Sequence, residues 1–218
     1  MKALAIDSVS STLTVAAKNE DRMASLTVDA GIHQSEVILT MIKTVLEESK
    51  LTAEDIEFAV LCSGPGSFTG LRLAYAALKA LQTAYKIPVY AFETLSTYAK
   101  EFENFKGIVL PVLDARRDRF YISFFENGKC ISGPLDIGID EVVKNLAEEK
   151  DILAVGPGCE LLKRKLSEIK PSINCICGVK NYNCSESLLQ LGKKAYDNAE
   201  KGIETFDGPF YIRDEHGD

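Results

Sequence analysis

The sequence predicts an α/β protein made of two consecutive units that share the element order βββαβαβα. Short apolar segments of strand character alternate with longer segments whose apolar residues recur at helical spacing. The same succession starts again near residue 107, about halfway along the 218 residues. A repeat of this length indicates two similar domains, which we place at residues 1–105 and 106–218. The last helix and the tail are candidates to pack back on the first domain.

In the first unit, three short strands precede the first helix. From Ser35 to Lys50 the apolar residues recur at helical spacing, and charged residues gather at the end of the segment. The continuous apolar run Phe58–Cys62 is typical of a parallel strand covered on both faces. The remaining elements predicted for this unit are strands at 2–7, 12–18, 23–28 and 87–92 and helices at 71–85 and 94–105.

The second unit repeats this order. Asn127 and Gly128 join two of its strands, and this dipeptide is typical of a two-residue hairpin. The predicted strands lie at 108–113, 119–125, 129–132, 152–155 and 173–177, and the helices at 139–149, 159–169 and 185–201. The order is that of a ribonuclease H-like half-domain, and a tandem pair resembles the actin-like ATPase (ASKHA) superfamily of actin, sugar kinases and chaperone ATPases.

Composition excludes several classes of function. With 46% hydrophobic residues the chain can bury a sizeable core, and a net charge of -7 makes the whole chain a poor match for a polyanion. We therefore expect nucleic acid to be contacted only through a partner. The apolar run in the first eight residues, MKALAIDS, is too short for a signal sequence or a membrane span, which predicts a cytoplasmic protein without membrane contact.

Cysteine and histidine usage argues against a metal site. The six Cys form no C-x-x-C pair, and several lie in apolar runs, so we expect reduced, buried thiols. Only two His occur, His33 and His216. This scarcity limits any proposal of a metal or acid-base site, and we predict neither metal ligands nor catalytic residues.

The nucleotide site expected for such a superfamily is incomplete. Active members open each domain with a strand, an Asp and a Gly-rich turn that grips phosphate. Here the matching segments begin at Asp7 and at Asp114, and neither is followed by glycine. Without glycine the backbone does not easily take the positive φ values that a phosphate nest needs. Asp7 and Asp114 are either strand-end caps or residual nucleotide contacts, and Ser10 is a further candidate for such a contact.

The most specific stretch is SGPGSFTGLR at residues 63–72, directly after a buried strand. A Walker A loop would need Gly-Lys before Ser or Thr, and none is present. Gly64 and Gly66, with Ser67 or Thr69 as helix caps, fit a weak anion-binding turn. The same residues fit a tight turn that brings the following Ala-rich helix close to the sheet.

At this loop the sequence resembles a known family. GPGSFTGLR, HQSE at residues 33–36, LDARRDRFY at 113–121 and PFYIR at 209–213 are similar to the TsaB (YeaZ) family over nearly the whole chain. The resemblance implies a non-catalytic subunit that pairs with its catalytic paralogue TsaD and with the ATPase TsaE. Together these proteins place a threonylcarbamoyl group on the adenosine beside the anticodon of tRNAs that read codons beginning with A.

Comparison with the paralogue also implies that its metal site is lost. Aligned on Ile-Pro-Val and a Glu, the two His ligands of the paralogue's His-Met-Glu-Gly-His fall on Ala91 and Leu95, neither of which coordinates a metal. His33 matches a His in the paralogue's SR-x-H segment but has no second imidazole at ligand spacing. We expect His33 to start a helix or to face a partner.

The resemblance also implies where the partner binds. In the family's assemblies the helices equivalent to 35–50 and 71–85 form a four-helix contact with TsaD, and the same face self-associates when TsaD is absent. The residues predicted for this contact are His33, Glu36, Val37, Met41, Leu71, Arg72, Ala74, Tyr75 and Leu78. The alternative is that the Ala-rich face packs only on its own sheet.

Two other hypotheses about the function stand beside that of a non-catalytic scaffold subunit. An autonomous ATPase or small-molecule kinase would need phosphate loops richer in glycine, although ATP or ADP could bind at the junction of the complex. A metalloprotease is the weakest hypothesis, because no H-E-x-x-H occurs. The basic runs at 116–119 and 163–165, with Arg116 and Arg117, fit solvated faces better than phosphate sites. The segment 205–213 should dock on the body, and 214–218 should be disordered.

Overall fold

The computed structural model describes residues 1–146, 151–178, 183–204 and 206–213. Their contacts divide the chain into two compact units. Unit 1 contains the described residues of 1–94 and 183–211, and unit 2 those of 95–182 and 212–213. The last helix is therefore in contact with the first unit. The division into two domains at residues 1–105 and 106–218 stays a prediction.

Unit 1 is built on a mixed five-stranded sheet of order β3-β2-β1-β4-β5. Strand β2 pairs antiparallel with β1 on one side and with the edge strand β3 on the other, and β4 and β5 continue the sheet from β1 in parallel. The bounds are β1 Lys2–Asp7, β2 Thr12–Asn19, β3 Arg22–Asp29, β4 Phe58–Cys62 and β5 Val89–Phe92, with helices α1 Gln34–Glu48, α2 Phe68–Tyr85 and α6 Ser185–Asp197 and the short 3-10 helix η1 Ala53–Asp55.

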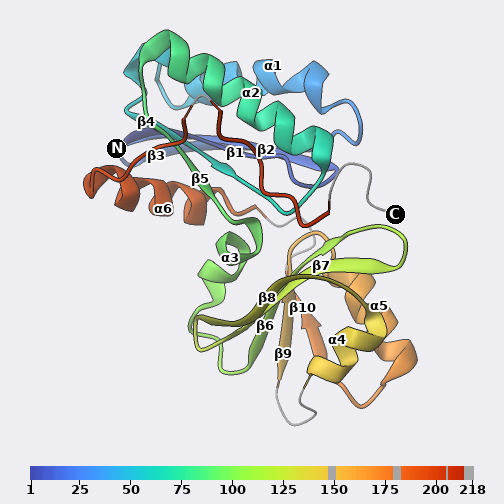
Figure 1. The fold of residues 1–218 in the computed structure, drawn as a ribbon. Helices are drawn as coiled ribbons and strands as arrows, with labels where there is room; N and C mark the ends of the chain where they lie inside the picture. The colour runs from blue at the N-terminus through green and yellow to red at the C-terminus, as the bar shows by residue number, and fades with distance from the viewer. Residues whose placement is uncertain (147–150, 179–182, 205, 214–218) are drawn as a thin grey trace. The chain divides into compact units, whose positions relative to one another are not determined.

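Both faces of this sheet are covered, as the apolar run of β4 predicts. Ala59 and Leu61 belong to the core that α1 and α2 complete. The alternate residues Phe58 and Val60 face α6, where Gly192 leaves no room for a side chain. Figure 1 shows α1 and α2 over one face and α6 against the other. All five residues of β4 are buried for this reason.

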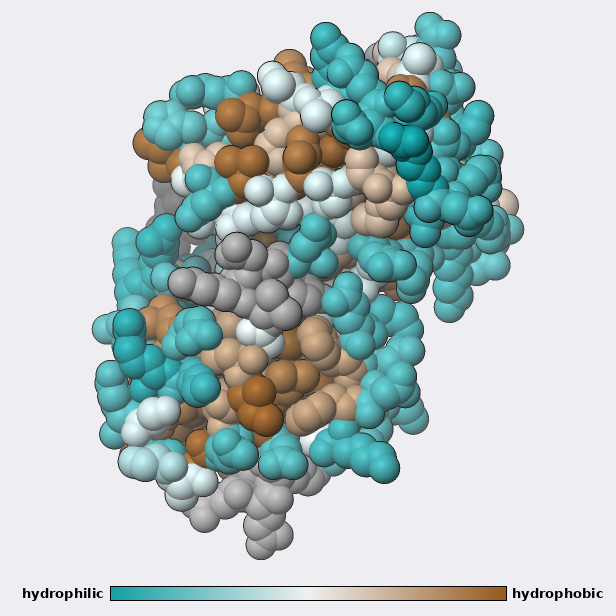
Figure 2. All heavy atoms as spheres, turned by 180° about the vertical axis from the view of Figure 1, so that it is seen from behind, coloured by the Kyte–Doolittle hydropathy of each residue, from teal (hydrophilic) through white to brown (hydrophobic). Residues whose placement is uncertain are grey.

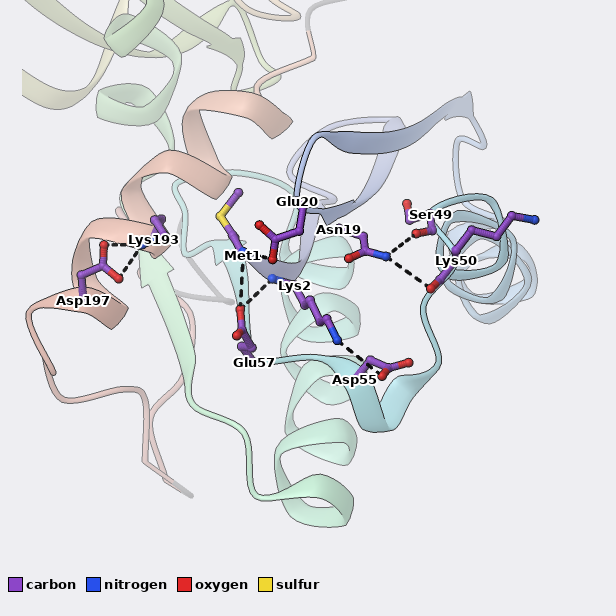
Figure 3. Close-up of polar contacts among 10 residues, drawn as sticks. All are labelled: Met1, Lys2, Asn19, Glu20, Ser49, Lys50, Asp55, Glu57, Lys193 and Asp197. Carbon is purple, nitrogen blue, oxygen red and sulfur yellow. Dashed lines mark hydrogen bonds and ion pairs between the residues drawn. The ribbon is translucent and has the colours of Figure 1, made fainter.

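Polar contacts tie the start of the chain and the end of α1 to the sheet (Figure 3). The ammonium group of Met1 lies 2.8 Å from Glu20 and 3.8 Å from Glu57. Asn19 donates to the carbonyl oxygens of Ser49 and Lys50 at 3.0 and 3.3 Å. These carbonyls lie just past the end of α1, where no further helical turn supplies a donor, so Asn19 satisfies acceptors that the helix leaves open.

Unit 2 repeats the arrangement with a sheet of order β10-β9-β6-β7-β8. Its strands are β6 Ile108–Asp114, β7 Arg119–Glu126, β8 Lys129–Gly138, β9 Ile152–Val155 and β10 Cys175–Cys177, and its helices are α4 Ile139–Asn145 and α5 Cys159–Ile169. The helix α3 Thr94–Ala99 and the 3-10 turn η2 Lys100–Phe102 connect the two sheets in sequence. The chain is therefore an α/β protein with two mixed five-stranded sheets.

Most predicted elements are confirmed, and the differences lie at their ends. Helix α2 begins at Phe68, three residues before the predicted start, because Ser67 caps it by accepting from the amide of Gly70 at 3.3 Å. Strand β8 extends to Gly138, past the predicted end at 132. The predicted hairpin is confirmed, since Asn127 and Gly128 have φ values of 50° and 71°.

The last described residues are held by the body, as predicted for 205–213, whereas 214–218 lie outside the described residues. In unit 1 the amide of Phe210 donates to Ser63 at 2.7 Å. In unit 2 the Arg213 guanidinium binds both carboxylate oxygens of Asp136, at 2.8 Å for one of them, and donates to the carbonyl of Ala115. Arg119 donates to the same carboxylate at 2.7 Å.

The ion pair of Asp136 with Arg213 and Arg119 should make the free energy of unfolding depend on pH. Burial raises the pKa of Asp136, but the hydrogen bonds and charges of Arg213 and Arg119 outweigh it and lower the pKa below its usual value. Because the pKa is lower in the folded state, the charged carboxylate stabilises the fold. This stabilisation is complete above the pKa of an ordinary carboxyl group, about 4, and is lost as the pH falls through the lower pKa of the folded state. Asp136→Asn should reduce the unfolding free energy by about 1–3 kcal/mol at neutral pH.

The measurement is urea unfolding of both proteins at pH 7 and at pH 3. The difference between their unfolding free energies should be large at pH 7 and should shrink at pH 3, where the carboxyl of the unfolded chain is already mostly protonated. Asp21→Asn, at an exposed turn, removes the same charge and should leave the unfolding free energy unchanged within about 0.5 kcal/mol. A difference for Asp136→Asn that stays constant with pH would contradict this account.

Among the described residues, no helix is both long enough and apolar enough to span a membrane.

Candidate functional site

The two predicted nucleotide-site carboxylates turn onto the backbone that follows them. Asp7, at the end of β1, is 7% exposed and accepts from the amide of Val9 at 3.2 Å. Its other oxygen accepts from the thiol of Cys184 at 3.3 Å. Asp114, at the end of β6, is exposed and accepts from the amide of Arg116 at 2.8 Å. Each Asp side chain therefore caps the end of its strand by accepting a hydrogen bond from the amide two residues further along.

Ser10 is likewise engaged locally. Its hydroxyl accepts from the amide of Thr12 at 3.1 Å, and its carbonyl accepts from the side chain of Gln34 at 2.7 Å. These contacts fix the turn between β1 and β2 against the start of α1. The geometry supports a structural role for this turn, and residual nucleotide contact stays a prediction.

Three amides of the GPGSFTG turn also meet internal acceptors. Gly64 donates to the Thr94 hydroxyl at 3.1 Å, and Ser67 donates to the carbonyl of Val9 at 2.7 Å. Gly70 donates to Ser67, as described above, while Thr69 is exposed. An anion nest needs amides that point together into solvent. The donors named here point into unit 1 instead, and this supports the interpretation as a close-packed turn.

Three glycines of this turn sit where a β-carbon would strike neighbouring backbone or a neighbouring side chain. At Gly64, which has a φ of 117°, the added carbon would lie 2.1 Å from the carbonyl oxygen of Phe210. At Gly66 it would lie 2.5 Å from Val9, and at Gly70 1.9 Å from the carbonyl oxygen of Ser8. The glycine pattern therefore has a sufficient cause in the approach of the β1–β2 turn and of the last residues to this loop.

An aromatic and basic cluster covers the start of α2. The rings of Phe68 and Tyr211 stack with centroids 4.8 Å apart. The guanidinium of Arg72 lies 3.6 Å from the centre of the Phe68 ring and donates to the Tyr211 hydroxyl at 3.3 Å. The predicted interface residue Arg72 is exposed, and its side chain is positioned by the chain's own C-terminal segment.

The structure divides the nine residues predicted for the partner contact. Four are exposed or partly exposed: His33, Glu36, Val37 and Arg72. The other five lie in the core of unit 1 or are less than a tenth exposed: Met41, Leu71, Ala74, Tyr75 and Leu78. In this structure these five side chains pack within unit 1. Their part in a partner contact stays a prediction.

The accessible surface of the helix pair is formed by other residues. Helices α1 and α2 contact each other on one side of the sheet (Figure 1). Half-buried and exposed small or apolar side chains follow this pair, and we name them the helix-pair face: Val37, Thr40, Leu73, Ala76, Ala77 and Ala80. Small side chains let a second helix approach closely. The face can therefore accept helices from another protein.

His33 starts α1, as predicted, and is exposed. Its Nδ1 lies 2.7 Å from the carboxylate of Glu36, three residues along the helix.

Hydrophobic exposure alone does not single out α1 and α2, since Figure 2 shows hydrophobic residues at the surface of both units. Leu39 in unit 1 is 70% exposed and Ile131 in unit 2 is 57% exposed.

The basic runs of unit 2 are exposed. Arg116 and Arg117 lie on the turn between β6 and β7, with φ values of 64° and 51°. The following Asp118 pairs with Lys165 of α5 at 2.8 Å. Lys163 and Arg164 line a shallow depression together with Glu160 and Glu168 of the same helix. Acidic neighbours accompany both runs, as expected for solvated faces.

One cluster was missed by the sequence prediction. The carboxylate of Asp7 and the thiols of Cys62 and Cys184 have ligand atoms that all lie within 4.8 Å of one another. Ala91 and Leu95, the positions aligned with the paralogue's ligands, offer no coordinating atom. Three buried residues from β1, β4 and the start of α6 meet although 177 positions separate the first from the last. Spacing in the sequence gives no signal of such a cluster.

Comparison with known proteins places the chain in a family. Residues 28–196, more than half of the chain, match the family model described as TsaD, tRNA N6-adenosine threonylcarbamoyltransferase. The "tRNA threonylcarbamoyladenosine biosynthesis protein TsaB" of Buchnera aphidicola subsp. Schizaphis graminum is 34% identical over 75% of this chain and 82% of its own length. The chain belongs to the TsaB family. The TsaB protein of Bacillus subtilis is 26% identical over 89% of this chain and 88% of its own length.

Solved structures share the fold of this chain. YeaZ from Pseudomonas aeruginosa superimposes on this TsaB-family chain with a TM-score of 0.76 at 23% identity, covering 97% of this chain and 99% of the other. A Bacteroides thetaiotaomicron protein with an actin-like ATPase fold gives 0.51 at 12% identity, covering 87% and 95%. At these identities the likeness concerns the fold alone, and it supports an actin-like ATPase fold for the TsaB-family chain.

Proposed function

We propose that this chain is a non-catalytic scaffold subunit of the complex that transfers a threonylcarbamoyl group to the adenosine next to the anticodon of tRNAs reading codons that begin with A. The observation that carries the proposal is its similarity to proteins named for tRNA threonylcarbamoyladenosine biosynthesis. In this proposal the chain pairs with TsaD, supports the binding of TsaE and contacts tRNA only through the complex, in the cytoplasm.

The geometry of unit 1 supports the non-catalytic part of the proposal. Asp7 caps the turn after β1, and amides of the GPGSFTG turn meet internal acceptors. A site that stabilises a transferring phosphoryl group instead needs donors and a metal-binding carboxylate that face the substrate. We therefore propose no tightly bound cofactor and place any ATP or ADP site at the junction of the complex. We also propose that each unit is a ribonuclease H-like half-domain.

The helix-pair face is the surface that we propose for TsaD. It is built from small and apolar side chains on two adjacent helices, which fits two helices of a related protein. The same face would form a homodimer when the chain is alone. Arg72 and Glu36 lie on the same two helices and supply polar groups for the rim of such a contact.

The deciding experiment is reconstitution with the TsaD and TsaE proteins of the same organism, threonylcarbamoyl-adenylate and tRNA, with each component omitted in turn. We expect a stable pair with TsaD and tRNA modification only when this chain is present. ATP hydrolysis by the chain alone, above that of a heat-denatured sample, would favour the autonomous ATPase or kinase. Full modification in its absence would overturn the scaffold role.

A further inference from the structure

We propose that Asp7, Cys62 and Cys184 form a binding site for one zinc-like divalent cation. The site lies at the carboxyl ends of the adjacent parallel strands β1 and β4, where the last residue of each strand meets the N-terminus of α6. Among the described residues this is the one group of three or more His, Cys, Asp or Glu side chains with ligand atoms close enough to share an ion.

The spacing of the ligand atoms fits tetrahedral coordination. The two sulfur atoms are 3.9 Å apart, and the Cys184 sulfur lies 3.3 Å from the nearer carboxylate oxygen of Asp7. With zinc–sulfur bonds of about 2.3 Å and zinc–oxygen bonds of about 2.0 Å, a regular tetrahedron sets these edges at about 3.8 and about 3.5 Å. For these two edges adjustments of about 0.1–0.2 Å suffice. The third edge, between Cys62 and Asp7, lies within 4.8 Å and would close on the ion, and a water molecule takes the fourth position.

Charge balance removes the usual objection to an ion in a core. The hydrogen bond with Cys184 lowers the pKa of Cys62, but burial and the negative charges of Asp7 and Glu93 raise it to about 11. The pKa of Cys184 is also raised, through its hydrogen bond with Cys62 and through burial. At neutral pH and without an ion, both sulfurs therefore carry protons beside one carboxylate.

Binding replaces two protons by one ion of charge +2, so the site keeps its net charge of -1. Each thiol loses its proton to solvent, and the sulfur lone pairs and the carboxylate form the bonds to the cation. The remaining negative charge lies at the N-terminus of α6, a helix of 13 residues whose first turn favours anions, and Cys184 is its N-cap. Because the net charge of the site does not change, burial opposes the exchange of two protons for one cation less than it would oppose the addition of an unpaired charge.

The ion would act structurally. Residues 183–211 belong to unit 1 but follow residues 95–182 of unit 2 in sequence, and Cys184 is the second residue of this segment. A cation held by Asp7, Cys62 and Cys184 would join the start of α6 to two strands of the sheet. The inference goes beyond the proposed function, because it concerns the stability of this chain and needs no partner.

Cobalt(II) is the probe for the test, because its thiolate and tetrahedral absorption bands report the ligands directly. The reduced full-length chain should take up one equivalent, show a near-ultraviolet charge-transfer band, lose it when Zn²⁺ is added, and release two protons per Zn²⁺ bound to the metal-free chain. Cys62→Ala and Cys184→Ala should abolish the band. Cys159→Ala, which removes a buried thiol of unit 2, should keep it.

A second measurement guards against variants that fail to fold. Zn²⁺ should raise the Tm of the wild type and of Cys159→Ala, while Cys62→Ala should unfold cooperatively at a Tm that Zn²⁺ does not change. Absence of the charge-transfer band in the folded wild type would overturn the proposal. A band that persists in folded Cys62→Ala or Cys184→Ala would overturn it as well, since the ion would then be bound elsewhere.

Discussion

Gly70→Ala is expected to lower the free energy of unfolding by about 3 kcal/mol or more. The new β-carbon would lie 1.9 Å from the carbonyl oxygen of Ser8 and 3.1 Å from the Gln34 side chain. The first of these contacts is with backbone at the end of β1, and the Ser8 hydroxyl already binds the Gly70 carbonyl at 2.7 Å. Neither the strand end nor the first turn of α2 can move away without breaking this hydrogen bond.

The sign of this effect is informative, because alanine is the better helix former by about 1 kcal/mol. If the glycine served only local flexibility, the substitution inside α2 would stabilise the chain. Gly208→Ala is the matched control in unit 1, since its added carbon meets nothing within 4 Å, and it should change stability by less than about 1 kcal/mol. Equal urea midpoints for Gly70→Ala and the wild type would contradict the close packing described here.

Ala80→Arg is expected to weaken the proposed complex with TsaD by at least about 30-fold, or about 2 kcal/mol. Ala80 is exposed on α2, so a longer side chain can extend into solvent. In the proposed four-helix contact the arginine would hold the partner helices apart and bury an unpaired charge. Arginine is also a good helix former, so the fold should persist.

The control places the same side chain on a helix of unit 2. Ser167 is exposed on α5, and Ser167→Arg adds the same positive charge away from the helix-pair face. Titration calorimetry with TsaD should give wild-type affinity for Ser167→Arg and reduced affinity for Ala80→Arg, with unchanged Tm values for both. Wild-type affinity of Ala80→Arg would move the partner site away from α1 and α2.

Short-range patterns in the sequence determined the element order. The apolar run of β4 predicted a strand covered on two faces, and the Asn127-Gly128 pair predicted the hairpin between β7 and β8. Side-chain periodicity and turn chemistry depend on neighbours within a few residues, which the sequence displays directly. The GPGSFTGLR motif likewise indicated the family before any contact was known.

Only the tertiary structure decided which of these residues face inward. Helical spacing marked Met41 and Leu78 as apolar, yet it could not tell whether a sheet or a partner covers them, and the structure places both in the core. The glycines of the GPGSFTG turn fitted an anion nest and a close-packed turn equally well. The approach of Ser8, Val9 and Phe210 favours the second, through contacts between segments distant in the sequence.

The same reason explains why the group of Asp7, Cys62 and Cys184 could not be predicted. Its members lie on β1, β4 and the start of α6, and they meet because the last segment of unit 1 returns to the sheet after unit 2 in sequence. The sequence by itself determined the order of strands and helices and the family. The non-local packing of the chain decided which faces are buried and which side chains meet, because burial depends on segments that no local pattern brings together.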